Sequence, residues 1–144
     1  MVRIKKNTKH VFAYLIDKIG SGIHLTLEAP EVMPFCIDIA QRDIQTAWGT
    51  GIHYYVCHWF QQGEMMFRDP GMAFIVVDNR ATPDDVDNLH IIPQLFAMDY
   101  CGIYRQSAII NNHHIVSEYP SLQQDQAAFL DIWFTNLQQQ GFIQ

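Results

Sequence analysis

Apolar residues recur at helical spacing near the start of the chain. They lie three or four residues apart, which predicts an amphipathic helix over residues 8–19. Asn7 or Thr8 is expected to cap this helix, because short polar side chains accept hydrogen bonds from its free N–H groups. Gly20 is expected to end it. The apolar face consists of Val11, Phe12, Leu15, Ile16 and Ile19.

From residue 22 the period of the pattern changes to two, which is typical of strands with one buried face. Pro93 interrupts residues 90–98, so this segment is expected to be an edge strand at best, since proline cannot donate to a sheet ladder. The predicted strands cover residues 23–28, 35–40, 52–60, 65–68, 72–77 and 100–110. Turn formers separate them at Pro30, Pro34 and Asp69-Pro70-Gly71, with a longer loop over residues 78–88.

The last predicted element is a helix that begins near residue 121. Ser121 and Gln124 form a capping-box pattern at its start, and Gly141 is expected to end it. Helices at both ends of the chain, with strands in consecutive hairpins between them, predict an α+β fold. We therefore expect a single domain over residues 1–144, with an N-terminal and a C-terminal helix packed on an antiparallel sheet of about six strands. The apolar stripe of the last helix consists of Leu122, Phe129, Leu130, Trp133 and Leu137.

Charge is divided unevenly along the chain. Residues 1–18 hold five basic residues against one acid, a charge of +4, whereas residues 19–144 hold four basic residues against fourteen acids, a charge of −10. The acidic body repels phosphate backbones, so nucleic-acid binding is disfavoured. Residues 1–6 are expected to form a flexible, solvated basic arm, whose removal changes the free energy of unfolding by less than about 0.5 kcal/mol.

Composition and motifs exclude several classes of protein. With 49% hydrophobic residues, a chain of 144 residues can fill one core. No apolar run approaches the roughly 20 residues of a membrane-spanning helix, so no membrane association is expected. The N-terminus lacks the apolar stretch of a secretory signal, which favours a cytoplasmic protein. P-loop, dinucleotide-binding, nucleophile-elbow and zincin motifs are also missing from the sequence.

Seven histidines and three cysteines raise the question of a metal site. His53 and His58 lie five residues apart in a predicted strand, so they point to opposite faces of the sheet. Cys36, Cys57 and Cys101 are far apart and form no Cys-x-x-Cys pair, so each is expected to be a buried free thiol. We therefore expect no metal site and no cofactor.

A cluster of polar residues stands in the apolar middle of the chain. In its functional interpretation Arg68 clamps an anion, while His58 or Asp69 transfers protons. In its structural interpretation Asp69 caps a turn, and Arg68 pairs with Asp99 to hold strands in register. Tyr104 completes the candidate cluster. Aromatic residues at strand spacing are expected to be core residues more than a stacking platform, namely Tyr54, Tyr55, Trp59, Phe60, Tyr100 and Tyr104.

The hairpin that carries this cluster also carries a family resemblance. Residues 58–72, which read HWFQQGEMMFRDPGM, and residues 99–104, which read DYCGIY, resemble an uncharacterised bacterial domain of unknown function. That family has an HYYEQNGDLMRDPEM-like hairpin and an NDYLGIYQ-like strand, and its members look like small proteins of plasmids, integrative elements and phages. The resemblance spans most of the chain. It implies a fold and a genetic setting, but no activity.

Two functions stay open on these grounds. The first is a small, non-enzymatic module that binds a protein partner, because catalytic motifs are missing and an acidic body suits basic protein surfaces. The second is a small hydrolase or ligand-binding enzyme with a site around His58, Arg68, Asp69 and Asp99. An enzyme is expected to gather these side chains in a concave pocket, whereas a binding module is expected to expose an apolar or acidic patch.

Overall fold

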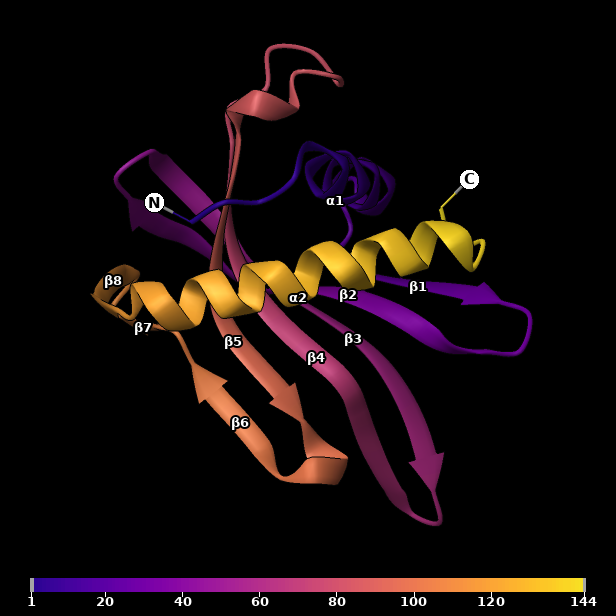
Figure 1. Ribbon diagram of the computed structural model, residues 1–144. Helices are drawn as coiled ribbons and strands as arrows, with labels where there is room; N and C mark the ends of the chain where they lie inside the picture. The colour runs from indigo at the N-terminus through magenta and orange to yellow at the C-terminus, as the bar shows by residue number, and fades with distance from the viewer. Residues whose placement is uncertain (1, 144) are drawn as a thin grey trace.

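The computed structural model describes residues 2–143 as two helices packed on one mainly antiparallel sheet (Figure 1). The α+β class predicted from the sequence is therefore confirmed. The helices are α1 (Lys6–Ile19) and α2 (Pro120–Gln139), and two short 3-10 helices are η1 (Val86–Asn88) and η2 (Asp99–Cys101). The strands are β1 (His24–Ala29), β2 (Val32–Thr46), β3 (Gly49–Gln62), β4 (Met65–Asp78), β5 (Leu89–Met98), β6 (Ile103–Gln106), β7 (Ala108–Asn111) and β8 (His114–Glu118).

In the described part of the chain the sheet has eight strands, where the sequence predicted about six. Their order is β6-β5-β4-β3-β2-β8-β7, and β1 pairs with β2 outside this path. β2 and β8 run parallel where Gln45 lies opposite His114, so the prediction of a purely antiparallel sheet was wrong. The parallel contact forms because the chain leaves β6 at one end of the strand order and enters β7 at the other.

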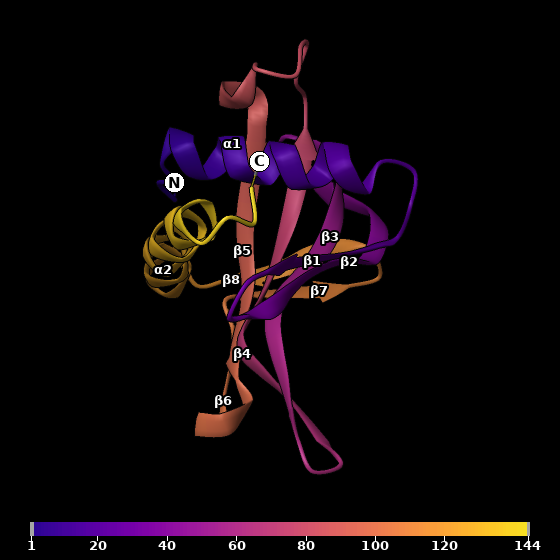
Figure 2. The same cartoon turned by 90° about the vertical axis from the view of Figure 1, so that its right-hand side faces the viewer.

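Both helices cover the same face of the sheet and close the main core against it. Phe12 of α1 is fully buried and lies edge-on to Phe74 of β4, with ring centroids 5.5 Å apart. The ring centroid of Phe134 of α2 lies 5.5 Å from that of Phe12, so Phe12 joins the two helices to the sheet. Figure 2 shows α2 beside the strands, with α1 running across above it. Apolar burial between the layers is the main stabilising term of such a fold.

A second, smaller core lies on the opposite face. It contains the buried side chains of Ile44, Ile75 and Ile92, and Ile110 and Ile115 pack against them from β7 and β8. The β7–β8 hairpin therefore covers part of the face that the helices leave open.

Gly20 ends α1 as predicted, but the starts of both helices differ from the predicted caps. α1 begins two residues earlier than predicted, after Lys5, without a side-chain cap. Thr8 is buried, and its Oγ1 donates to Asp131 Oδ1 of α2 at 2.5 Å, so it links the helices. α2 begins at Pro120, which needs no N–H partner at the first helical position, so the capping box predicted at Ser121 was wrong.

Two prolines that were expected in turns lie inside strands. Pro34 lies within β2, and Pro70 follows a cis peptide bond within β4. The register of β3 and β4 is irregular between Cys57 and Trp59, which accommodates the extra residue of β4 there. The turn predicted at residues 69–71 was therefore wrong.

Pro93 likewise lies within a strand, opposite Phe74 of β4. Its carbonyl oxygen accepts a hydrogen bond from Gln123 Nε2 of α2 at 3.1 Å, so a helix side chain supplies the hydrogen-bond partner of this backbone group. Beyond this proline β5 lies between β4 and β6, which pairs with residues 95–98. The expectation of an edge strand at best was wrong for that half of β5.

Residues 100–110 form parts of three elements instead of the single predicted strand. Gly102 ends η2 at φ +67°, a left-handed conformation that glycine adopts at low cost. Ser107 separates β6 from β7, and its hydroxyl donates to Gln126 Oε1 of α2 at 2.6 Å. The spacing of apolar residues does not reveal that residues 100–110 are divided among three elements, because a change of strand partner leaves the local pattern unaltered.

Candidate functional site

Residues of β3 alternate between the two faces of the sheet, and this alternation divides the candidate cluster. His58 packs on the helix-covered face, where its ring centroid lies 5.6 Å from that of Trp133 of α2. Arg68 of β4 lies opposite Trp59, the next residue of β3, and so belongs to the other face. The structure therefore does not bring His58 and Arg68 together.

Arg68, Asp99 and Tyr55 form a polar network on that other face. The Arg68 guanidinium donates from Nε to Asp99 Oδ2 at 2.9 Å and from Nη2 to Asp99 Oδ1 at 2.7 Å, a bidentate ion pair. The Arg68 backbone N–H also donates to Asp99 Oδ2 at 2.9 Å, and Nη1 donates to Tyr55 Oη at 2.8 Å. The predicted pairing of Arg68 with Asp99 is confirmed, and it ties η2 to β4.

The network holds its groups in fixed protonation states near neutral pH. Hydrogen bonds from Arg68 keep the pKa of the Asp99 carboxyl below its usual range. Burial raises the pKa of Tyr55 to about 12, against the opposing charge of Arg68. Tyr55 Oη lies directly over Gly71, where an added Cβ would lie only 2.2 Å from it. A phenol with this pKa and a paired carboxylate are poor proton-transfer groups at neutral pH.

His58 is a hydrogen-bonded core residue. Its Nδ1 donates to Met33 O at 3.0 Å, with Pro34 O at 3.3 Å, and only 6% of the residue is exposed. Burial lowers its pKa, so the ring is neutral at pH 7. Its surroundings are aromatic, consisting of Phe35, Trp133 and Phe142.

Asp69 and Tyr104 do not extend the polar network. Asp69 is half-buried within β4, where the predicted turn that was to offer it N–H groups does not form. Tyr104 lies on β6 opposite Ala97 and is 59% exposed. Two prominent pockets in the described part of the chain are lined by none of the five candidate residues. Neither pocket is therefore the cavity in which an enzyme was expected to gather the candidate residues.

An exposed apolar surface lies at the end of the hairpin formed by β3 and β4. Phe60 and Phe67 stack with ring centroids 5.2 Å apart, and Tyr100 of η2 lies 5.9 Å from Phe67. Tyr100 is 65% exposed, and Met65 and Met66 beside the turn are 63% and 61% exposed. We call these five residues the tip patch. The end of the β3–β4 hairpin and η2, which connects β5 to β6, both lie well beyond the two helices (Figures 1 and 2).

Sequence reasoning located this hairpin but missed the patch. The expectation that strand aromatics are core residues holds for Tyr54, which is 3% exposed, but is wrong for Tyr100 and Tyr104, which are exposed. The missed signal is the run Met65-Met66-Phe67 directly after a turn, where a strand with one buried face would alternate with polar residues.

The structure of the described residues also bears on the expectations about metal sites, free cysteines and membrane-spanning helices. Within residues 2–143 no three or more His, Cys, Asp or Glu side chains are grouped to hold a metal ion. Cys36 and Cys57 are buried free thiols opposite each other on β2 and β3, whereas Cys101 is exposed, so its predicted burial was wrong. Neither described helix combines the length and apolarity that crossing a bilayer requires.

Comparison with known proteins places the chain beside one family. A family model described as a domain of unknown function (DUF6908) matches residues 6–143. No curated protein matches the chain, and no solved structure does. Any function therefore has to be inferred from the surfaces themselves.

Proposed function

The chain belongs to the DUF6908 family, a domain of unknown function, and we propose that it is a protein-binding module that contacts its partner through the tip patch. The observation that carries this proposal is the exposure of Met65, Met66 and Tyr100 at the end of the hairpin, around the half-buried ring pair of Phe60 and Phe67. The alternative enzyme has no comparable support, since its four residues line neither prominent pocket of the described chain.

The composition of the tip patch suits a protein partner. Contiguous exposed apolar groups on soluble proteins are commonly interaction sites. Aromatic residues and methionine are enriched at the centres of protein interfaces, and the flexible methionine side chain adapts to irregular surfaces. Phe60, Phe67 and Tyr100 contact one another, so they offer a continuous surface.

The polar network holds the tip patch in shape. Arg68 directly follows Phe67, and Asp99 directly precedes Tyr100, so their ion pair joins the two segments that carry the Phe67 and Tyr100 rings. A surface that is ordered before binding loses less conformational entropy when the partner docks. In this proposal Arg68 and Asp99 are positioning residues.

The charge around the patch favours a partner with a basic rim. Glu64 is exposed in the hairpin turn and Asp69 lies on β4, while Asp99 neutralises the charge of Arg68. The whole chain has a net charge of −6. Opposite potential on the partner would speed association and disfavour other acidic proteins.

The family resemblance supplies the setting of the proposal. The module acts in the bacterial cytoplasm, encoded by a plasmid, an integrative element or a phage. Its partner in this setting is a host protein.

Affinity capture from bacterial lysate tests the proposed function. The wild-type chain is compared with Met65→Ser/Met66→Ser, which removes exposed apolar surface and leaves the core intact. Ile132→Ser is the matched control, because Ile132 is 64% exposed but lies on α2. We expect the wild type and the control to capture one partner, and the tip variant to recover it about tenfold less, as for loss of central interface contacts. Equal recovery with all three chains would contradict the proposal.

A further inference from the structure

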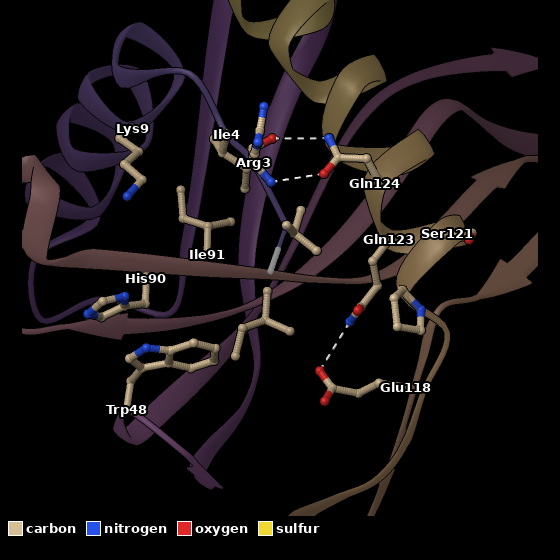
Figure 3. A pocket seen from close by; sticks show the side chains of 13 residues that line it. Arg3, Ile4, Lys9, Trp48, His90, Ile91, Glu118, Ser121, Gln123 and Gln124 are labelled. Carbon is tan, nitrogen blue, oxygen red and sulfur yellow. Dashed lines mark hydrogen bonds between the residues drawn. The ribbon is translucent and has the colours of Figure 1, made fainter.

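A pocket of about 640 Å³ lies beside β5, where the N-terminal arm, α1, the β2–β3 turn and the start of α2 meet (Figure 3). Its volume is in the range of small-molecule sites. The arm forms one wall and is fixed to α2, since the Arg3 N–H donates to Gln124 Oε1 at 2.9 Å and Gln124 Nε2 donates to Arg3 O at 3.3 Å. No tip-patch residue lines this pocket, so the two surfaces are independent.

Apolar and aromatic side chains line one part of the pocket. Ile91 and Ile92 come from opposite faces of β5, and Ile4 comes from the arm. Trp48 of the β2–β3 turn stacks on His90, with ring centroids 5.4 Å apart and an interplanar angle of 18°. Trp48 keeps 38% of its surface exposed, so part of a large aromatic ring is open to a ligand. This lining suits a ligand with a flat apolar body.

Two cationic side chains stand at the same pocket. Arg3 and Lys9 line it, and neither forms an ion pair with an acid in residues 2–143. Figure 3 shows the Lys9 side chain pointing toward the stacked rings of His90 and Trp48, and burial and the positive charge of Lys9 lower the pKa of His90. Among the described lining residues Glu118 is the only acid, and it accepts a hydrogen bond from Gln123 Nε2 at 3.3 Å. The pocket therefore has an excess of positive charge in an otherwise acidic protein.

We propose that this pocket binds a small amphipathic organic anion. Its flat apolar body lies against Trp48 and Ile91, and its acid group lies between Arg3 and Lys9. Two unpaired cations beside an apolar surface favour such a ligand over a neutral one, because hydrogen bonds from a charged donor to an anion are stronger than those between neutral groups. A carboxylate, a sulfonate or a phosphate monoester supplies the acid group that this site needs.

Anilinonaphthalene sulfonate is a suitable probe, since it joins flat apolar rings to a single sulfonate and fluoresces when it leaves water. The full-length protein is titrated with this dye and, separately, with phenylnaphthylamine, which has the same rings without the acid group. We expect saturable binding of the sulfonate at one site per chain and weaker binding of the neutral compound. Arg3→Glu/Lys9→Glu should weaken sulfonate binding by about tenfold or more, the effect of losing one to two charge-assisted hydrogen bonds.

Two control variants separate this site from other sources of dye binding. Lys5→Glu/Lys6→Glu makes the same change of net charge at exposed lysines that do not line the pocket, and Met65→Ser/Met66→Ser removes the exposed methionines of the tip patch. We expect both to change the affinity less than about twofold, as for surface changes outside a site. The proposal is overturned if no saturable binding occurs, if the neutral compound binds equally well, or if either control matches the loss seen with the pocket variant.

Discussion

All three guanidinium nitrogens of Arg68 donate hydrogen bonds, Nε and Nη2 to Asp99, which lies 31 residues away, and Nη1 to Tyr55, which lies 13 residues away. Arg68→Ala and Asp99→Ala are each expected to lower the free energy of unfolding by about 1–3 kcal/mol, because each leaves a half-buried polar partner without its hydrogen bonds. The double variant should lose less than the sum of the single losses, since both remove the same contact. Urea unfolding of the three variants measures this.

The opposite result would change the interpretation of the polar network. An Arg68→Ala chain more stable than the wild type would indicate a residue that is retained for function at a cost in stability. That outcome would favour the enzyme over the binding module.

His58 makes stability depend on pH. Burial lowers its pKa in the folded chain below the 6.5 of an unfolded one, so the unfolded state binds a proton first as the pH falls. The free energy of unfolding should therefore decrease below about pH 6.5, by at most about 1.4 kcal/mol per pH unit for one histidine. Burial acts in the same direction on His53.

Urea melts between about pH 7.5 and pH 5.5 test this dependence. His58→Gln should flatten the decrease, whereas His10→Gln, at an exposed position of α1, should leave it unchanged. If the slope of the wild type and of His58→Gln is the same, the buried ring is not its source.

Among the elements, the N-terminal arm makes contacts that its sequence did not predict. The Arg3 and Lys5 N–H groups donate to Gln124 Oε1 at 2.9 Å and to Asp131 Oδ1 at 3.2 Å, and Ile4 packs against the main core. Gln124→Ala should therefore lower the free energy of unfolding by about 0.5–1.5 kcal/mol, the contribution of a typical hydrogen bond.

Denaturant unfolding distinguishes these contacts from a solvated arm. Gln139→Ala is the control, because Gln139 is exposed near the end of the same helix. A change below about 0.5 kcal/mol for Gln124→Ala would agree with the solvated arm that the charge pattern predicted.

The β3–β4 hairpin owes its exposed end to its length. β3 and β4 have 14 residues each, whereas typical strands have about 5–6. Their inner halves pair under the helices, and their outer halves extend past them (Figure 1). The apolar residues of the outer halves consequently lack a helix to pack against, and η2 supplies only part of their cover.

At the scale of the whole molecule, the two proposed surfaces use different parts of the charge distribution. The tip patch belongs to the acidic body, whereas the pocket beside β5 draws its cations from the first 18 residues. Met65→Ser/Met66→Ser and Arg3→Glu/Lys9→Glu therefore affect one surface each, so failure of one proposal leaves the other standing.

The sequence by itself determined the terminal helices and most strand-forming segments, and it offered Asp99 as one candidate partner of Arg68. Helical spacing and alternation are properties of neighbouring residues, whereas the carboxylate that pairs with an arginine in a strand is selected by the fold. The α1 helix over Lys6–Ile19 differs from its prediction by only two residues at its start.

Only the tertiary structure decided the strand order, the parallel contact of β2 with β8, the prolines inside strands and the exposure of the tip patch. Each of these depends on which distant segment lies alongside. Gln123 satisfies the carbonyl of Pro93 from another element, and no helix reaches the outer end of the hairpin. Strand pairing and burial arise from contacts between residues far apart in the chain, and these contacts cannot be predicted from the local pattern of apolar residues.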